Sequence, residues 1–429
     1  MPEEKEPHLT VYKGKSILVT SDGKESVFLE GRPNTKAQAR LQKIEKTLKN
    51  GYLENLIEEL KKSGTGQGID QEHLALLERL TGAVTSEVGR AIVGLSVLML
   101  VVKAIEPEQS IRLHKGGTGE FSWQEGIPMR SLDANYITPV LRRYDLLKLN
   151  NFGFMMTRSL AENYPYSAVY KAAIRGAKEE WIIMVDLIER GNANPRSLLE
   201  ALISILINHS DRVKKLGEEV LQKVGTYLEL EPDIEAVALI IKQHIKESSY
   251  SARLLEVAMH SLFQVFSDNK KLSGKLSPLS QMRSANKKHG NVGDIEVTNP
   301  ANQYYVIEAW DAKFGKPYLR DELEELHDKL ISHPEVEIAG FVVDRKPEIT
   351  EDISNRVQEL NIVHGINVQI VSFDEWIKDQ IERYSGIPLK KVAAEWLFAY
   401  SESLASKRRE TAPIDEPTDL WLQDLKGIL

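Results

Sequence analysis

The stretch from Asn291 to Arg345 constrains the fold of this chain more than any other part of it. Two apolar, strand-like segments come first, Ile295–Val297 and Tyr304–Phe314, and they are joined by a turn signal. A helical pattern follows from Leu319 to Ser332, and then a strand of buried type from Ile338 to Val343. This order predicts an α/β unit in which a hairpin leads to a helix and the helix to a further strand.

Charged residues occur at defined positions on these strands. Asp311 and Lys313 are two residues apart, so the alternation of a β-strand points both side chains to one face. Asp294 opens the first strand, beside the expected position of that face. Mg²⁺ usually takes one or two carboxylates, and the pattern therefore predicts a magnesium site suited to phosphodiester cleavage. The alternative is that Asp311 and Lys313 form an ion pair on a solvated strand face. Neighbours such as Ala309 and Trp310, however, have the character of buried residues. Burying charged side chains that have no binding or catalytic role is energetically unfavourable.

The composition limits the partners and the chemistry. A chain of 429 residues with 42% hydrophobic content can form two or three domains, each with its own hydrophobic core. Its 55 Lys and Arg against 63 Asp and Glu give a net charge of -8, so any contact with nucleic acid must come from local basic patches. With no cysteine, thiolate metal sites and cysteine nucleophiles are excluded. No signal peptide is recognisable at the N-terminus, and a cytoplasmic location is expected.

The chain before this stretch is expected to be mainly helical. Short apolar runs within Leu9–Leu29 predict a small β-meander, and helical spacing then runs from Thr35 to Lys62 and on to Ile105. A glycine-rich segment without this spacing follows from Glu106 to Asn163. The most apolar run, Ala91–Val102, is too short to cross a membrane, which takes about 20 residues, and predicts a buried helix. From Tyr166 onward the pattern is helical, with a predicted break at His209–Asp211.

The chain after residue 245 predicts an alternation of helices and strands. Ser251–Asp268 reads as an amphipathic helix, followed by a loop, Lys270–Gly293. Further strands and helices extend to Tyr384, and one more helix, Lys390–Ser406, precedes a charged tail with two prolines. We therefore expect an α+β protein with three regions: a mainly helical region for DNA recognition and dimerisation (1–245), a catalytic domain (246–385), and a C-terminal helix and tail (386–429).

The order helix, strand, strand, helix, strand, helix, strand from Ser251 to Val371 resembles the core of the PD-(D/E)XK nucleases. The motif residues stand here as Gly293-Asp294 and Asp311-Ala312-Lys313, with glycine in the place of the proline that names the family. The resemblance covers about a third of the chain. It implies a mixed central sheet, hydrolysis of DNA phosphodiester bonds, and Mg²⁺ as the cofactor.

The resemblance also implies a role for individual residues. Asp294, Asp311 and the backbone carbonyl of Ala312 would bind the metal, and Lys313 would position the attacking water or stabilise the transition state. Glu256 lies on the first helix, where many members carry a glutamate that reaches the metal through water; a helix-surface glutamate is the alternative.

Two other glutamates lie on the same strands. Glu296 shares the face of Asp294 and is a weaker candidate for the metal site. Glu308 has the wrong parity relative to Asp311, so it is not expected to be a ligand.

Two segments are candidates for contact with DNA. A basic loop precedes Asp294 and suits phosphate binding, although a solvated loop would look the same. Its candidate residues are Arg283, Lys287, Lys288 and His289. The block from His114 to Arg158 mixes glycine, arginine and aromatic residues, as a base-reading surface or an ordinary helical subdomain would. The candidates in it are Lys115, Arg142 and Arg143.

These features together predict a Mg²⁺-dependent, sequence-specific nuclease that resembles type II restriction endonucleases. No nucleotide-binding phosphate loop and no HExxH zinc motif are present. Cutting both strands of DNA needs two sites, so a homodimer is expected, with a DNA methyltransferase as functional partner. The alternatives are a repair or structure-selective nuclease, and a DNA-binding or scaffold protein without catalytic activity.

Overall fold

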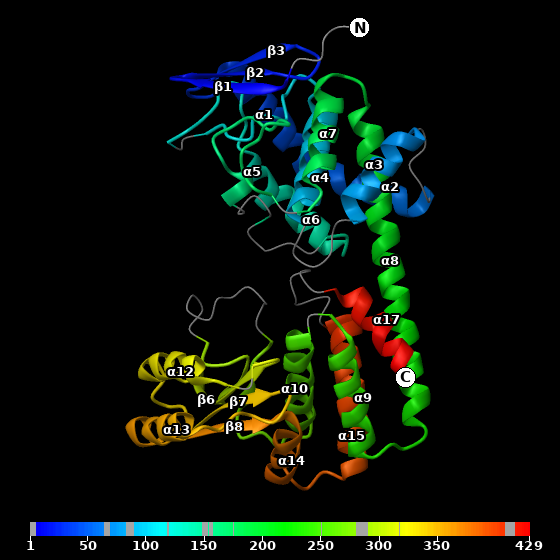
Figure 1. Ribbon diagram of the computed structural model, residues 1–429. Helices are drawn as coiled ribbons and strands as arrows, with labels where there is room; N and C mark the ends of the chain where they lie inside the picture. Colours follow the sequence, from blue (N-terminus) through cyan, green and yellow to red (C-terminus); the bar gives the residue numbers. More distant parts are fainter. Residues whose placement is uncertain are drawn as a thin grey trace. The chain divides into compact units, whose positions relative to one another are not determined.

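The computed structural model describes residues 6–63, 69–82, 90–117, 120–147, 153, 158–174, 176–249, 251–279, 291–316, 318–407 and 417–429. The protein is α+β and mostly helical, with a small antiparallel sheet near the N-terminus and a five-stranded mixed sheet interleaved with helices toward the C-terminus (Figure 1). This confirms the predicted fold class at that level. Contacts divide the chain into two compact units, with the boundary between Arg212 and Val213. The three functional regions expected from the sequence stay predictions.

The first unit begins with the predicted β-meander. Strands β1 (His8–Tyr12), β2 (Lys15–Val19) and β3 (Glu25–Leu29) pair antiparallel in that order. Leu18 and Phe28 point from this sheet into a small core, which also contains Leu113 and Trp123. The meander is therefore held by residues nearly 100 positions further along the chain.

Most of the other described elements of the first unit are helices. Their bounds are α1 (Thr35–Lys49), α2 (Tyr52–Ser63), α3 (Gln71–Gly82), α4 (Arg90–Ile105), α5 (Met129–Leu132), α6 (Thr138–Arg143) and α7 (Lys178–Glu189), with a π-helical turn at Asp133–Ile137. As predicted, α4 is buried, with nearly all of its side chains inside the unit. Within the described ranges, no helix is both long and apolar enough to cross a membrane.

Two predictions about residues 166–246 were wrong. Helix α8 (Pro195–Leu228) continues through the break expected at residues 209–211, because those polar residues include no glycine or proline and propensity alone is a weak constraint. Residues 166–174 are not helical; the Tyr166 and Tyr170 hydroxyls instead donate hydrogen bonds to the Leu160 and Ser159 carbonyls, at 2.5 and 3.0 Å.

The expected charged tail contains a helix, α17 (Thr418–Ile428). Its residues Trp421, Leu422 and Leu425 are buried. Pro417 immediately precedes the helix, a position where proline is tolerated because the first N–H groups of a helix have no partner within it. The proline therefore marked the start of a helix rather than a tail.

The second unit is built around the five-stranded sheet, in the order β4-β5-β6-β7-β8. The strands are β4 (Lys275–Leu276), β5 (Ile295–Asn299), β6 (Asn302–Lys313), β7 (Ile338–Val343) and β8 (Asn367–Ser372). Strand β6 pairs antiparallel with β5 and parallel with β7. The four longer strands were predicted; β4 lies in the segment that was expected to be only a loop.

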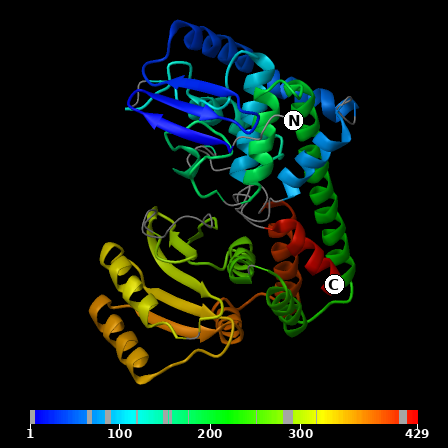
Figure 2. The ribbon, with the colours of Figure 1, turned by 45° about the horizontal axis from the view of Figure 1, so that its top comes forward.

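Helices cover both faces of this sheet. On one face lie α12 (Arg320–Ser332) and α13 (Glu351–His364), the two crossover helices between parallel strands (Figure 2). On the other lie α10 (Ser251–Asp268), α14 (Phe373–Arg383) and α15 (Leu389–Glu402), with α9 (Ile234–Glu247) and α17 packed in the same core. Along β6, Trp310 and Ala312 belong to the α10 side, whereas Ala309 belongs to the α12 side.

Gly340 on β7 allows the fully buried Trp310 to pack against the sheet. A Cβ at this glycine would lie 2.4 Å from Cζ3 of Trp310. We expect Gly340→Ala to lower the free energy of unfolding by about 1–3 kcal/mol, because a packed core does not give way easily. Urea denaturation measures this. Gly427→Ala is the control, since a Cβ there meets nothing within 4 Å. Equal stability of Gly340→Ala and the unchanged protein would contradict the prediction.

Candidate active site

Adjacent strands bring Asp294 and Asp311 together. Ile295 of β5 pairs with Trp310 of β6, so the residues next to them, Asp294 and Asp311, face each other on the α12 side of the sheet. The backbone N–H of Ala312 donates a hydrogen bond to Oδ2 of Asp294 at 3.0 Å. The two carboxylates are thus held by the register of the hairpin.

Lys313 lies beside this pair on the same strand. Its Nζ is 3.1 Å from Oδ2 of Asp311, and the side chain of Lys313 is largely buried, with 19% of its surface exposed. Asp311 is only 6% exposed, and its other oxygen, Oδ1, is buried and receives no hydrogen bond from an N–H group of the described residues. A buried carboxylate oxygen without a partner is unfavourable, and a cation bound at this position would satisfy it.

The pair carries its charge unequally. Burial, together with the charge of Asp311, raises the pKa of Asp294 well above its usual range. Burial acts in the same direction on Asp311, but the charges of Lys313 and Lys329 outweigh it and lower the pKa of Asp311. Removal from water disfavours a charged Lys313, yet the two aspartates raise its pKa. In this structure the favoured state is a protonated Asp294 beside an ionised Asp311 and a charged lysine.

The segment that leads into Asp294 is held by Glu296. Oε1 of Glu296 accepts hydrogen bonds from the N–H groups of Val292 and Gly293, at 2.6 and 3.4 Å. A Cβ at Gly293 would lie 2.8 Å from the carbonyl oxygen of Trp310, closer than real contacts allow. Glycine at this position is therefore explained by the close approach of this segment to β6. Glu296 shares the face of Asp294, as predicted, but is engaged with the backbone.

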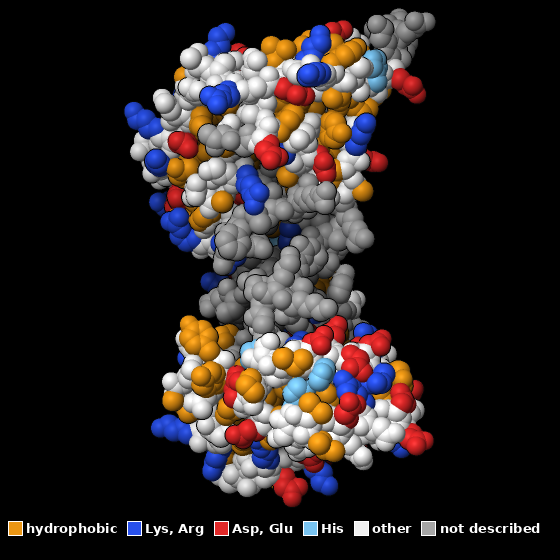
Figure 3. Space-filling model, turned by 90° about the vertical axis from the view of Figure 1, so that its left-hand side faces the viewer, with side chains coloured by type: hydrophobic (Ala, Val, Ile, Leu, Met, Phe, Trp, Pro, Cys, Tyr) orange, Lys and Arg blue, Asp and Glu red, His pale blue; other side chains and the backbone are white. Residues whose placement is uncertain are grey.

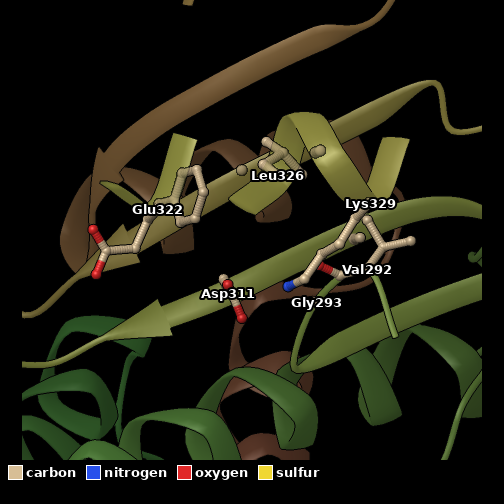
Figure 4. Close-up of a pocket in the computed structure, with 10 residues that line it drawn as sticks. Val292, Gly293, Asp311, Glu322, Leu326 and Lys329 are labelled. Atoms are coloured by element: carbon tan, nitrogen blue, oxygen red, sulfur yellow. The ribbon is translucent and has the colours of Figure 1, made fainter. Parts of the chain in front are cut away.

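Helix α12 completes the surroundings of Asp311. Glu322, Leu326 and Lys329 lie on one face of this helix and line a pocket together with Gly293 and Asp311 (Figure 4). The ammonium group of Lys329 reaches toward the strands and donates a hydrogen bond to the Val292 carbonyl at 3.1 Å. The sequence analysis missed Lys329. The spacing of residues 322, 326 and 329 was the available signal, because a crossover helix after β6 packs on the sheet next to it.

Two other glutamates lie on the α10 side of the sheet or on α10 itself. Glu308, 2% exposed, accepts hydrogen bonds from Nε1 of Trp310 (2.7 Å), Nη1 of Arg383 (2.6 Å) and the Tyr384 hydroxyl (2.8 Å). These contacts agree with the prediction that Glu308 points to the opposite face of the sheet from Asp311. Glu256 forms an ion pair with Arg253 on the same helix, and α10 packs against the face that carries Trp310 and Ala312. The structure therefore does not bring Glu256 into contact with the aspartates, and its catalytic role stays a prediction.

The residues predicted to contact DNA are only partly described. Arg283, Lys287, Lys288 and His289 lie outside the described residues. The other three candidates, Lys115, Arg142 and Arg143, lie in the first unit. Lys115 donates a hydrogen bond to Oδ1 of Asn163 at 2.6 Å, and Arg143 is 3.4 Å from Oε1 of Glu54. On the face seen in Figure 3, described basic and acidic side chains are intermingled in both units. The DNA contacts of all these residues stay predictions.

The donors at the site fit Mg²⁺ better than zinc. Asp294 and Asp311 offer two hard carboxylates, and the described part of the chain has no cluster of three or more His, Asp or Glu placed to hold a metal. Mg²⁺ keeps several waters and needs only one or two carboxylates, whereas zinc sites in proteins usually have three or four protein ligands. The unpartnered Oδ1 of Asp311 is consistent with a cation at this position.

The chemistry open to this site follows from the residues it contains. Two adjoining carboxylates and a charged lysine can bind a divalent cation and orient a phosphate next to it. Comparison with known proteins adds no assignment: no family model matches the chain, and no curated protein matches it.

Proposed function

We propose that this protein is a Mg²⁺-dependent deoxyribonuclease that resembles type II restriction endonucleases and hydrolyses double-stranded DNA at a specific sequence. One observation carries the proposal. On neighbouring strands, Asp294 and Asp311 adjoin Lys313, and Oδ1 of Asp311 is buried with no N–H donor among the described residues. Keeping two carboxylates side by side and away from water is unfavourable, and the cost is offset when the pair binds a cation.

The arrangement of the second unit supports the same proposal. Helix α10, the antiparallel strands β5 and β6, crossover helix α12 and the parallel strand β7 follow in the order expected of a PD-(D/E)XK core. The aspartates and the lysine lie at the positions where that family carries its motif. An unrelated mixed sheet has no reason to place a second carboxylate opposite an Asp-Ala-Lys sequence.

Each residue has a distinct part in the proposed reaction. Asp294 and Asp311 would hold Mg²⁺, with the carbonyl oxygen of Ala312 as a further ligand, and the proton on Asp294 would leave as the cation binds. Bound Mg²⁺ supplies Lewis-acid activation of water and stabilises negative charge on the phosphate. Lys313 stays protonated because the aspartates raise its pKa, so it acts as a hydrogen-bond donor to the attacking water or the phosphate and not as a general base.

The remaining parts of the proposal concern specificity and assembly. The first unit would recognise the DNA sequence, and the second unit would hydrolyse the phosphodiester bond. Because each chain has one proposed site, cutting both strands calls for a homodimer. A methyltransferase that protects the same sequence in the host would be the functional partner.

Incubation of the purified protein with supercoiled plasmid and Mg²⁺ tests the proposal. A sequence-specific nuclease converts the plasmid into discrete fragments. Nicks confined to structured DNA would indicate a repair or structure-selective enzyme instead, and DNA binding without any cutting would indicate a scaffold. The same preparation with excess EDTA is the control, since cutting that persists there would contradict metal dependence.

A further inference from the structure

Lys329 is a second lysine beside the two aspartates, and it comes from a different element than Lys313. It lies in α12, whereas Lys313 ends β6. We propose that Lys329 binds a non-bridging oxygen of the phosphate that is cut, from the α12 side of the pocket. This proposal rests on the nuclease function proposed above and adds a catalytic residue to it.

The geometry places the ammonium group at the pocket that Asp311 also lines. Lys329, Asp311 and Gly293 line one pocket, and the side chain of Lys329 extends from α12 toward the strands (Figure 4). Its Nζ lies 3.1 Å from the carbonyl oxygen of Val292, two residues before Asp294. Glu322, from the same face of the helix, points its carboxylate away from Asp311, so the acidic and basic ends of this helix face are separated.

The hydrogen bonding of Lys329 leaves it able to accept an anion. An ammonium group has three donors, and the Val292 carbonyl takes one of them. Among the described residues, no carboxylate lies within ion-pair distance of Lys329, whereas the neighbouring Lys313 is 3.1 Å from Asp311. Its charge nevertheless acts on two nearby carboxyls. Together with Lys313 it lowers the pKa of Asp311, and it opposes the burial that raises the pKa of Glu296. A half-buried cation with two open donors, next to a metal-binding carboxylate pair, suits a phosphate oxygen.

A purely structural role is the competing explanation. Lys329 would then only hold the Val292 carbonyl and, through it, the segment that leads into Asp294. The two roles differ in what happens when the charge is removed and the length is kept. A phosphate contact contributes to the salt dependence of DNA binding, whereas a backbone clamp contributes to stability alone.

The full-length protein with Lys329→Met, Lys329→Arg and Lys378→Met separates these roles. Methionine preserves most of the apolar stem and removes the ammonium. Lys378 is the matched control, because it is an exposed helical lysine on α14, which covers the other face of the sheet. The substrate is a short duplex with the sequence that the unchanged protein cuts, identified from its plasmid fragments.

We expect Lys329→Met to cut this duplex about 100-fold more slowly in single-turnover assays, as for the loss of one donor to a transition state. The slope of log K against log[salt], measured with Ca²⁺ in place of Mg²⁺, should become less steep by about 0.9, the value for one phosphate contact. Lys329→Arg should restore most of both quantities, and Lys378→Met should change neither.

Other outcomes overturn the proposal in distinguishable ways. If the unchanged protein cuts and Lys329→Met matches it in rate and salt slope, Lys329 has no role in phosphate binding while the nuclease function stands. If Lys329→Met has a lower unfolding midpoint and an unchanged salt slope, the lysine is a structural clamp. If the unchanged protein cuts no DNA, the nuclease function fails first and this inference fails with it.

Discussion

Asp311→Asn and Lys313→Met are each expected to abolish DNA cleavage, with a loss of at least about 1000-fold in single-turnover rate, while DNA binding changes little. Asparagine keeps the shape of Asp311 but removes the charge that would hold the cation in the proposed reaction. Methionine keeps the stem of Lys313 but removes the donor next to Oδ2 of Asp311. The expected rate loss is large because, in the proposed reaction, both groups would act on the reacting phosphate rather than on the rest of the DNA.

Matched substitutions on exposed helix surfaces provide the controls. Asp379→Asn and Lys378→Met change the same residue types on α14, away from the aspartate pair. They should cut DNA at the rate of the unchanged protein. Full cleavage by Asp311→Asn would contradict the proposed function. Loss of cleavage in the control variants would instead indicate a contaminating nuclease or a folding defect.

Asp294→Asn is expected to stabilise the protein while it removes activity. Burial and the adjoining Asp311 raise the pKa of Asp294, so ionising it in the folded state is unfavourable. Asparagine is neutral at every pH and can still accept the hydrogen bond from the Ala312 N–H. We expect a gain in the free energy of unfolding of about 1–3 kcal/mol near neutral pH.

The sign of the pH dependence makes this prediction specific. Because the pKa of Asp294 is raised in the folded state, the folded protein binds more protons than the unfolded chain above the usual aspartate pKa of 3.8. The stability that comes from the protonated form is complete below that value and is lost as pH rises through the folded pKa. The advantage of Asp294→Asn should therefore be small near about pH 4 and large near about pH 8.

Urea denaturation of both proteins across this range measures the difference. Asp328→Asn, at an exposed position on α12, is the control and should show no comparable gain. A variant that is less stable than the unchanged protein at the high end of the range would contradict the account of Asp294. A gain that does not vary with pH would show that its origin is not the titration of this carboxyl.

Elements with a strong apolar period were predictable from the sequence. Helix α10 was predicted with its observed bounds, Ser251–Asp268, and strands β5, β6 and β7 were predicted within a few residues. Local patterns were insufficient where a long-range contact decides the conformation. The buried Trp421 of α17 is one example, since its Nε1 donates to the carbonyl of Ser249, 172 residues earlier.

The sequence by itself determined which face of the strands carries the candidate site. Asp311 and Lys313 share a face because side chains alternate along a strand, and the turn before Tyr304 sets the register that places Asp294 beside them. Only the tertiary structure decided what surrounds them. The packing of α12 brings Lys329 into the pocket, and the same packing removes Oδ1 of Asp311 from water. The burial of a side chain and the charges around it depend on elements that are distant in the chain, so a local sequence pattern does not reveal them.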